Sequence, residues 1–164
     1  MTGSVHQLNV SNGGVPKYAI PEAEATPLGL AGDRQAHPEF HGGLRQALLL
    51  ISRENLDALR EDGWPLFPGA LGENVTTEGI DFRQVRIGQR YRIGEAIVEI
   101  TKVRQPCHQL DPYGQGIQRA IFDRAAKNND PRSAHWGLSG FYAAVPRPGL
   151  IRTGDIIQLL DQVV

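Results

Sequence analysis

Residues 81–103 alternate between apolar and polar side chains with the period of two that is typical of β-strands. Tyr91 and Ile93 flank Arg92, and a Gly94-Glu95 pair then marks a tight turn before the next alternating run. The apolar positions of the neighbouring runs are Val85, Ile87, Ala96, Val98 and Ile100. The pattern predicts successive β-strands, with the last two joined as a hairpin.

Four further short runs predict strands elsewhere in the chain. They are residues 6–11, 46–51, 140–145 and 154–160, and the first leads into a turn at residues 12–14. The run QALLLI, residues 46–51, is of the continuously apolar type expected for a buried strand. Glycine and proline separate these runs, which indicates frequent turns.

Two segments carry helical spacing. In residues 52–63, Ser52 is placed to cap the first turn, Leu56 and Leu59 share one face, and Gly63 can end the helix. The second segment, residues 117–127, has its apolar residues at helical spacing and ends before the sequence Asn-Asn-Asp-Pro. We expect one helix in each segment.

Many short strands, few helices and frequent glycine turns predict a mainly β fold, closed as a barrel or folded as a sandwich, with a few peripheral α-helices. We expect a single domain over residues 1–164, because no linker divides the chain. Strands and helices do not alternate regularly, and neither a GxGxxG nor a Walker-type loop is present in the sequence. A doubly wound nucleotide-binding fold is therefore not expected.

Charge and composition argue against several classes of function. The net charge of -1 at pH 7 argues against a general nucleic-acid binder. No apolar run approaches the roughly 20 residues needed to cross a bilayer, and the first residues lack the pattern of a secretory signal, so we expect no membrane partner. The single cysteine cannot form an internal disulfide, which fits a reducing compartment and predicts a cytoplasmic protein.

The only cysteine, Cys107, lies in the polar sequence VRQPCHQLD, residues 103–111. A thiolate is both a nucleophile and a soft metal ligand, and the positive charge of Arg104 nearby favours this charged form. The alternative is a small buried hydrophobic residue, since unpaired cysteine is among the most buried residue types. His108 is not expected to be its base, because adjacent side chains of an extended chain point to opposite faces.

A base or proton donor for this thiol would come from another loop, and His37, His41 and His135 are the candidates. The spacing of His37 and His41 is seen in zinc sites, but Gly42-Gly43 would end any helix that carried both. Zinc is therefore the less favoured interpretation. The alternative for His41 is a packing or hydrogen-bonding role at the glycine turn.

The sequence GEN, residues 72–74, lies in another glycine-rich segment. Gly72 lets the backbone approach a ligand closely, Glu73 offers a carboxylate, and the amide of Asn74 can donate to a phosphate or a ring carbonyl. The alternative is a turn in which Glu73 or Asn74 caps local backbone groups.

Taken in order, four segments resemble the MOSC domain family, named after the C-terminal domain of molybdenum cofactor sulfurase. They are GLAGDRQAH…HGG, PGALGENVTTEGI, VRIGQRYRIGEAIVEI and TKVRQPCHQLD. The resemblance continues through HWGLSGFYAAVPRPGLIRTGDII, and the opening LNVSNGGVPK is similar to short bacterial members. It covers nearly the whole chain.

The resemblance implies a β-barrel with a few peripheral helices and a site for the molybdenum cofactor, molybdopterin with its bound metal. The family's cysteine, a sulfur carrier or molybdenum ligand, corresponds to Cys107. Candidate cofactor-binding residues are Arg34, Arg45, Gly72, Glu73, Asn74 and Arg104. Candidate proton donors are His41 and His135. We expect Arg34, Arg45 and Asn74 to line one pocket with Cys107.

The family's activities leave several functions open. The leading hypothesis is a molybdenum-cofactor oxidoreductase that reduces N-hydroxylated compounds such as hydroxylamino purines and amidoximes. The alternatives are a persulfide carrier on Cys107 that serves metal–sulfur centre assembly, a cofactor-binding module without catalysis and, outside the family, a cysteine hydrolase. The chain lacks a flavin or nicotinamide fingerprint and a cysteine set for an iron–sulfur cluster, so a reductase would need a separate electron-donor protein.

Overall fold

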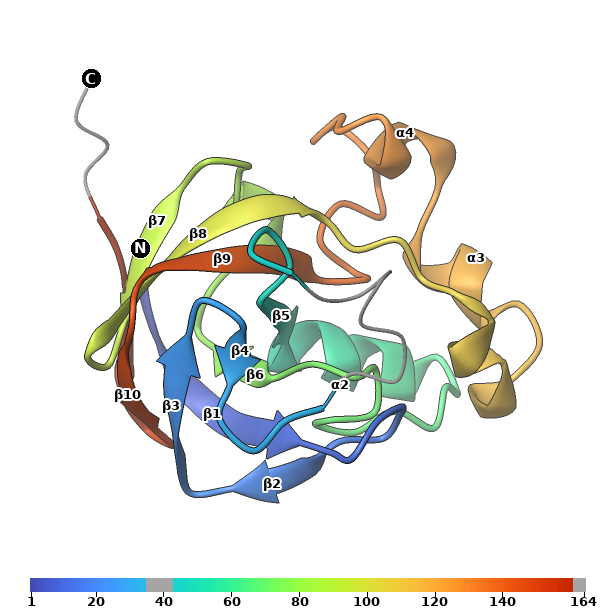
Figure 1. Cartoon of the computed structure of the whole chain (residues 1–164). Helices are drawn as coiled ribbons and strands as arrows, with labels where there is room; N and C mark the ends of the chain where they lie inside the picture. The colour runs from blue at the N-terminus through green and yellow to red at the C-terminus, as the bar shows by residue number, and fades with distance from the viewer. Residues whose placement is uncertain (35–42, 161–164) are drawn as a thin grey trace.

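A closed β-barrel forms the centre of the protein, whose computed structural model describes residues 1–34 and 43–160 (Figure 1). Its strands are β1 (Thr2–Val10), β5 (Leu48–Ser52), β6 (Val75–Glu78), β7 (Arg90–Ile93), β8 (Ala96–Val103), β9 (Phe141–Arg147) and β11 (Ile156–Leu159). They follow one another in the order β11-β7-β8-β9-β5-β6-β1, and β1 pairs with β11 to close the circle. Of these neighbouring pairs, β5–β6 is parallel and the rest are antiparallel. The predicted mainly β fold is confirmed, with the barrel rather than the sandwich.

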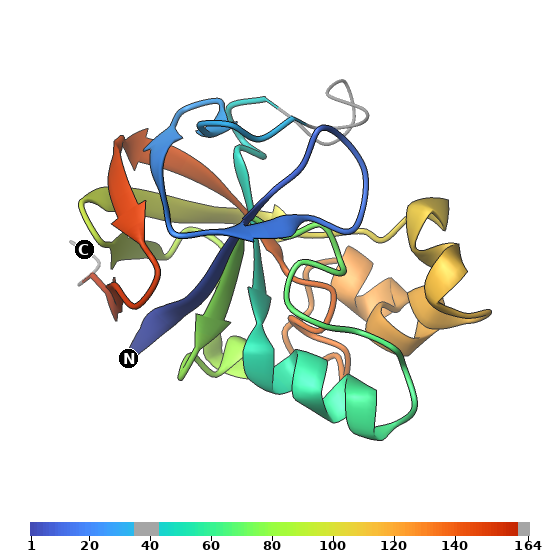
Figure 2. The ribbon, with the colours of Figure 1, turned by 90° about the horizontal axis from the view of Figure 1, so that it is seen from below.

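Shorter elements surround the barrel. Strand β2 (Tyr18–Ile20) pairs with the end of β1, and β10 (Gly149–Arg152), β3 (Glu22–Thr26) and β4 (Gly29–Leu30) form a separate three-stranded sheet. The helices are α2 (Arg53–Glu61), α3 (Ile117–Ile121) and α4 (Arg124–Lys127), and the 3-10 turns are η1 (Phe82–Gln84) and η2 (His108–Tyr113). In both views, α3 and α4 lie away from the sheet of β3 and β10 (Figures 1 and 2). No helix of the described residues is long and apolar enough to cross a membrane.

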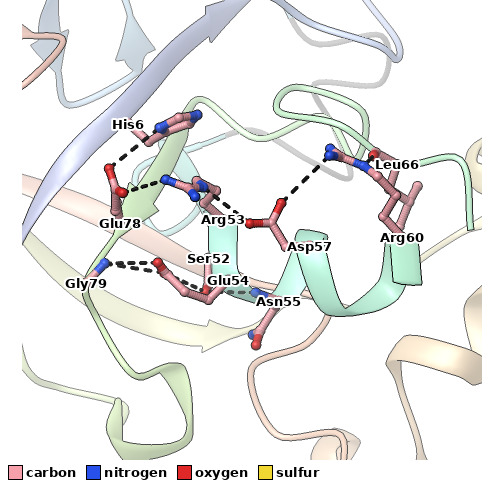
Figure 3. Close-up of polar contacts among 10 residues, drawn as sticks. All are labelled: His6, Ser52, Arg53, Glu54, Asn55, Asp57, Arg60, Leu66, Glu78 and Gly79. Atoms are coloured by element: carbon pink, nitrogen blue, oxygen red, sulfur yellow. Dashed lines mark hydrogen bonds and ion pairs between the residues drawn. The ribbon is translucent and has the colours of Figure 1, made fainter. Parts of the chain in front are cut away.

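Helix α2 begins and ends as its sequence predicts. The hydroxyl of Ser52 accepts a hydrogen bond from the backbone N–H of Asn55 at 3.2 Å, and Leu56 and Leu59 are buried (Figure 3). Gly63 follows the last turn with φ of 99°, in the left-handed region that glycine adopts without strain. The helix is therefore set by a cap, an apolar face and a glycine stop.

Charged contacts fix α2 to the end of β6. The carboxylate of Glu54 accepts hydrogen bonds from the backbone N–H of Gly79 at 3.1 and 3.3 Å, and Arg53 pairs with both Glu78 and Asp57 (Figure 3). Exposed ion pairs of this kind contribute about 0–1 kcal/mol each. They set the orientation of the helix more than they stabilise the fold.

One predicted strand, around Val85 and Ile87, is wrong. Asp81 caps the 3-10 turn η1 by accepting a hydrogen bond from the backbone N–H of Arg83 at 3.0 Å, and the chain then turns before β7. The carbonyl of Val85 accepts a hydrogen bond from the indole of Trp136 at 2.8 Å instead of joining a ladder. A local cap and a distant tryptophan thus override a short alternating pattern.

The single helix predicted over residues 117–127 is also wrong, because the structure breaks it in two. Phe122 takes an extended conformation with φ of -152° and ψ of 143°. Asp123 then caps α4 by accepting a hydrogen bond from the backbone N–H of Ala126 at 2.8 Å. Buried Ile117 and Ile121 belong to one side of this break, and Ala126 to the other.

Two apolar clusters hold the fold together. One fills the barrel and includes the inward-facing residues of β8, which alternate as predicted. The second lies outside the barrel, between α2, η2, α3 and the segment before β6, and contains Leu56, Leu66, Leu71, Leu110 and Ile117. The second cluster therefore supports the loops at one end of the barrel.

We expect Ser52→Ala to lower the free energy of unfolding by about 1 kcal/mol, because it removes the acceptor of an otherwise unpaired helical N–H. Urea unfolding followed by circular dichroism measures this loss. Asn55→Ala is the matched control, since only the backbone of Asn55 takes part in the cap, and it should change stability by no more than a few tenths of a kcal/mol. Equal losses in both variants would contradict the capping role.

Candidate functional site

A pocket lies at the end of the barrel where the loops before β5 and β6 meet those after β1 and β8. It is a small pocket with a cavity volume of about 50 Å³, and it is partly open to solvent. Among the residues that line it are Val15, Lys17, Leu49, Leu71, Gly72, Asn74, Arg104 and Tyr142. They come from distant parts of the chain, and only the barrel brings them together.

Arg104 lies in the wall of this pocket and is only 5% exposed. Its guanidinium donates to two backbone carbonyls, from Nη2 to Leu71 at 2.9 Å and from Nη1 to Ser139 at 3.3 Å. Its own carbonyl accepts a hydrogen bond from the Ser139 hydroxyl at 2.6 Å. Its Nε is buried and has no hydrogen-bond partner among the described residues. Backbone carbonyls thus hold the guanidinium in place, and its Nε–H has no acceptor among the described residues.

Cys107 lies beside this wall, half-buried, in an extended conformation just before η2. Burial lowers the pKa of Arg104, while the charges of Tyr142, Cys107 and Glu73 act in the opposite direction. An arginine remains protonated even so. Burial raises the pKa of Tyr142, Arg104 lowers it, and Cys107 raises it further. The thiol therefore lies close enough to two pocket residues for their charges to interact.

Glu73 is fully buried behind the pocket, and its own loop uses its carboxylate. Oε2 accepts hydrogen bonds from the backbone N–H of Gly69 at 3.0 Å and from the hydroxyl of Thr76 at 2.9 Å. Oε1 accepts one from the backbone N–H of Leu71 at 3.2 Å. Burial raises the pKa of Glu73, and these hydrogen bonds oppose the shift. The carboxylate shapes the segment that carries Gly72 into the pocket wall.

Asn74 lines the pocket, but its amide already has partners at both ends. Oδ1 accepts a hydrogen bond from the backbone N–H of Leu49 at 3.1 Å, and Nδ2 donates to Asp33 Oδ2 at 2.8 Å. Of the two roles that the sequence left open for GEN, these contacts favour local bonding over direct ligand contact by the Glu73 and Asn74 side chains.

Lys17 and Asp33 form a buried ion pair that sequence reasoning missed. Lys17 Nζ lies 2.6 Å from Asp33 Oδ1, and the two side chains are 7% and 4% exposed. Asp33 also accepts hydrogen bonds from the backbone N–H of Ser11 at 3.0 Å and from Asn74. Both charged residues lie within segments that carry the family resemblance, which was the available signal.

Two predicted arginines do not line this pocket. The backbone N–H of Arg34 donates to the carbonyl of Ser11 at 2.9 Å, and the Arg34 side chain is exposed. The side chain of Arg45 is 68% exposed and pairs with Glu99 at 3.2 Å, beside Arg90 on the outside of the barrel. Cys107 is not among the lining residues of the pocket either, so of the four residues expected to share it, Asn74 alone lines it.

Of the three candidate histidines, the structure describes one, His135. His135 Nδ1 lies 2.9 Å from Asp123 Oδ2, next to a hydroxyl of Ser133 that bonds the same carboxylate, and His135 is not among the residues that line the pocket. His37 and His41 lie outside the described residues.

We expect Asp33→Ala to cost about 3–5 kcal/mol of stability, because it leaves the Lys17 ammonium buried without its partner. Glu99→Ala is the control. Glu99 also pairs with cations, Arg45 and Arg90, but both are exposed, so its loss should cost about 0–1 kcal/mol per pair. Urea unfolding of both variants gives the comparison. Similar losses would show that the Asp33 pair does not hold the pocket segments together.

Comparisons with known proteins show which family and which relatives the chain resembles. Residues 37–158 match the model of the MOSC domain. The chain is 39% identical over 146 residues to protein YiiM of Escherichia coli, covering 87% of this chain and 61% of that protein. It is 30% identical over 139 residues to a protein of Gibberella moniliformis named "Reductase", covering 82% of this chain and 23% of that one. The chain thus spans less than two thirds of the length of each relative.

A solved structure supports the same assignment at the level of the fold. The crystal structure of YiiM from Geobacillus stearothermophilus superposes with a TM-score of 0.75 at 24% identity, covering 99% of this chain and 77% of that one. The family model matches most of the chain, and the chain therefore belongs to the MOSC domain family.

Proposed function

We propose that this protein binds the molybdenum cofactor in the pocket beside Arg104 and reduces N-hydroxylated compounds with electrons from a separate donor protein. Membership of the MOSC family and the relative named "Reductase" support this reaction class. The observation that carries the proposal is the half-buried thiol of Cys107 beside a fixed, buried cation in a pocket wall.

The residues fit such a cofactor. The group is anionic and rich in sulfur, and a thiolate is a compatible additional ligand for its metal. The buried Nε of Arg104 lacks an acceptor within the described residues, and a buried N–H without a partner is rare in folded proteins. An acceptor atom of a bound ligand would satisfy it. Gly72 brings backbone to the pocket wall without a side chain in the way.

When bound, the cofactor supplies the two-electron removal of oxygen from an N–OH group, which with two protons gives an amine and water. Cys107 would hold the metal through its sulfur. Leu49 and Leu71 give the pocket an apolar wall that limits water. Tyr142 lines the pocket, and a tyrosine phenol carries its proton at neutral pH, so its Oη would be a candidate proton donor there. This assignment does not use His135, which bonds Asp123 instead.

A persulfide carrier is the second candidate. The proximity of Cys107 to Arg104 favours it, because a buried guanidinium stabilises an anionic sulfur group as well as a thiolate. Cyanide-labile sulfur in purified protein without molybdenum would support the carrier. Stoichiometric molybdenum with pterin fluorescence supports the reductase.

We expect Cys107→Ser, made in a host that synthesises the cofactor, to lose molybdenum retention and hydroxylamino purine reduction while its melting temperature stays nearly unchanged. Half-burial makes the stability effect small, and the lost sulfur removes the metal ligand. Metal analysis, pterin fluorescence and single-turnover reduction measure the three properties.

The matched control for this prediction is Arg45→Met, which removes a side chain outside the pocket and should keep both molybdenum and activity. If Cys107→Ser reduced the substrate as well as the wild-type protein, the thiol would not be a required ligand. The cofactor would then be held by its pterin and phosphate alone.

A further inference from the structure

The outer face of strands β7, β8 and β9, which run side by side in the barrel, is rich in arginine (Figure 1). Residues that pair directly across two strands carry their side chains on the same face of the sheet. Tyr91 pairs with Val98 and both are buried in the barrel, so the alternate positions of these strands face outward. The outward positions of β7 are Arg90 and Arg92, and both are exposed.

The strand register arranges the outward side chains in two rows. In the first row, Arg90 of β7 lies opposite Glu99 of β8. In the second, Arg92 lies opposite Ile97, and Ile97 lies opposite Arg147 of β9. Arg92 and Arg147 are exposed, and neither forms an ion pair within residues 1–34 and 43–160. The second row therefore presents two cations to solvent.

Glu99 is the one carboxylate in these two rows. It lies 3.2 Å from Arg45 and 3.0 Å from Arg90, so two cations share one acid. Arg92 and Arg147 add two further positive charges. The whole chain has a net charge of -1, and the excess of positive charge is therefore a property of this face.

A groove beside these rows has apolar walls. Its cavity volume is about 300 Å³, and it is lined by Pro27, Leu44 and Pro146 together with Arg45 and Glu99. The side chain of Leu44 is 63% exposed, which leaves apolar surface for a partner to cover. Arginine around apolar surface is typical of protein-binding surfaces, whereas interfaces with nucleic acid are more polar. The composition of the groove favours a protein partner.

The groove adjoins the pocket beside Arg104. Ala144 lines the groove and Tyr142 lines the pocket, and the two residues lie two positions apart on the outward face of β9. Two residues of a strand span about 7 Å. Arg45 in the groove and Gln46 in the pocket are consecutive in the sequence. A protein bound at the groove therefore lies next to the pocket wall.

We propose that this face is the docking surface for the electron-donor protein, which presents carboxylates to Arg92 and Arg147. The identity of the partner rests on the proposed function, because that function takes its electrons from another protein. Charge complementarity is the argument for an acidic donor, since opposite charges steer the encounter and fix its orientation. A one-electron donor docks twice for each N–OH group, and its two electrons with two protons give an amine and water.

The first test measures binding to the full chain purified from a host that lacks the cofactor. The probes are plant-type ferredoxin and flavodoxin, two acidic electron-transfer proteins, and fluorescence anisotropy of the labelled probe follows the complex. We expect binding at low ionic strength that weakens as salt screens the charges. Arg92→Gln/Arg147→Gln should bind about fivefold more weakly or worse. The matched control Arg124→Gln/Lys127→Gln removes the same charge from exposed positions of α4 and should bind as the wild type does.

Glu99→Gln tests the same surface in the opposite direction. The substitution removes the acid that Arg45 and Arg90 share, so the face becomes more positive. We expect it to bind the same probes about twofold more tightly or better. Weaker binding by this variant would contradict an acidic partner.

The second test measures turnover by protein loaded with the cofactor. Arg92→Gln/Arg147→Gln should raise the KM for the protein donor and leave kcat nearly unchanged, because docking is weakened and the pocket is intact. Reduction driven by methyl viologen, a small reductant that needs no docking surface, should be equal in the wild type and in both double variants. A merely structural role of the two arginines would instead lower both activities.

The proposal is overturned if the wild-type protein binds neither probe, or if Arg92→Gln/Arg147→Gln binds them as tightly as the α4 control. Tighter binding of a DNA duplex or of vesicles that contain phosphatidylserine, lost in the same double variant, would overturn it in favour of a nucleic acid or a membrane. Reduction driven by methyl viologen in protein that binds neither probe would reject the docking surface and leave the proposed function standing. Probe binding that depends on the two arginines, in loaded protein that reduces no N-hydroxylated compound, would reject the proposed function and leave a surface for an acidic protein.

Discussion

The carboxylate of Asp33 is the contact on which the pocket depends. It joins the backbone at Ser11, the ammonium of Lys17 and the amide of Asn74, so that three segments distant in sequence meet at one buried group. Asn74 in turn accepts from the backbone of Leu49 in β5 and so ties the group to the barrel. A buried charge is costly unless it is paired and hydrogen-bonded, and a network whose members are all satisfied specifies one arrangement. These hydrogen bonds hold the segments of the pocket wall in place.

On the other side of the pocket the buried charged group is a cation, and hydrogen bonds to the protein fix it in the same way. Arg104 is held by backbone carbonyls, and the loop that supplies one of them is shaped by the buried carboxylate of Glu73. The oxygens of Glu73 accept hydrogen bonds from their own loop, and no ion pair joins Glu73 to Arg104 among the described residues. A site of this kind is preorganised for an anionic ligand, because the cost of desolvating and ordering its groups is met during folding. Cys107 gains a fixed electrostatic surrounding from the same arrangement.

Local sequence predicts the elements whose signals are local. The hairpin of β7 and β8 and the capped helix α2 follow from alternation, a glycine turn and Ser52. Closure of the barrel does not, because it depends on pairing between β1 and β11 at opposite ends of the chain. The break at Phe122 escapes prediction for a similar reason, since tertiary packing overrides a helical pattern that has no proline or glycine within it. The same distinction applies to the candidate site. Cys107, Arg104 and the sequence GEN can be recognised as local motifs. The role of Arg45 cannot, because its ion-pair partner Glu99 lies 54 residues away in the sequence.

The most direct test of the account is the number of sulfur atoms bound to molybdenum in the cofactor-loaded protein. X-ray absorption at the molybdenum edge counts these ligands without reference to substrate or electron donor. The account predicts one sulfur ligand in the wild-type protein beyond those that the pterin dithiolene supplies. A sulfur count that the dithiolene alone explains would contradict the central claim that the thiol of Cys107, beside Arg104, is a metal ligand.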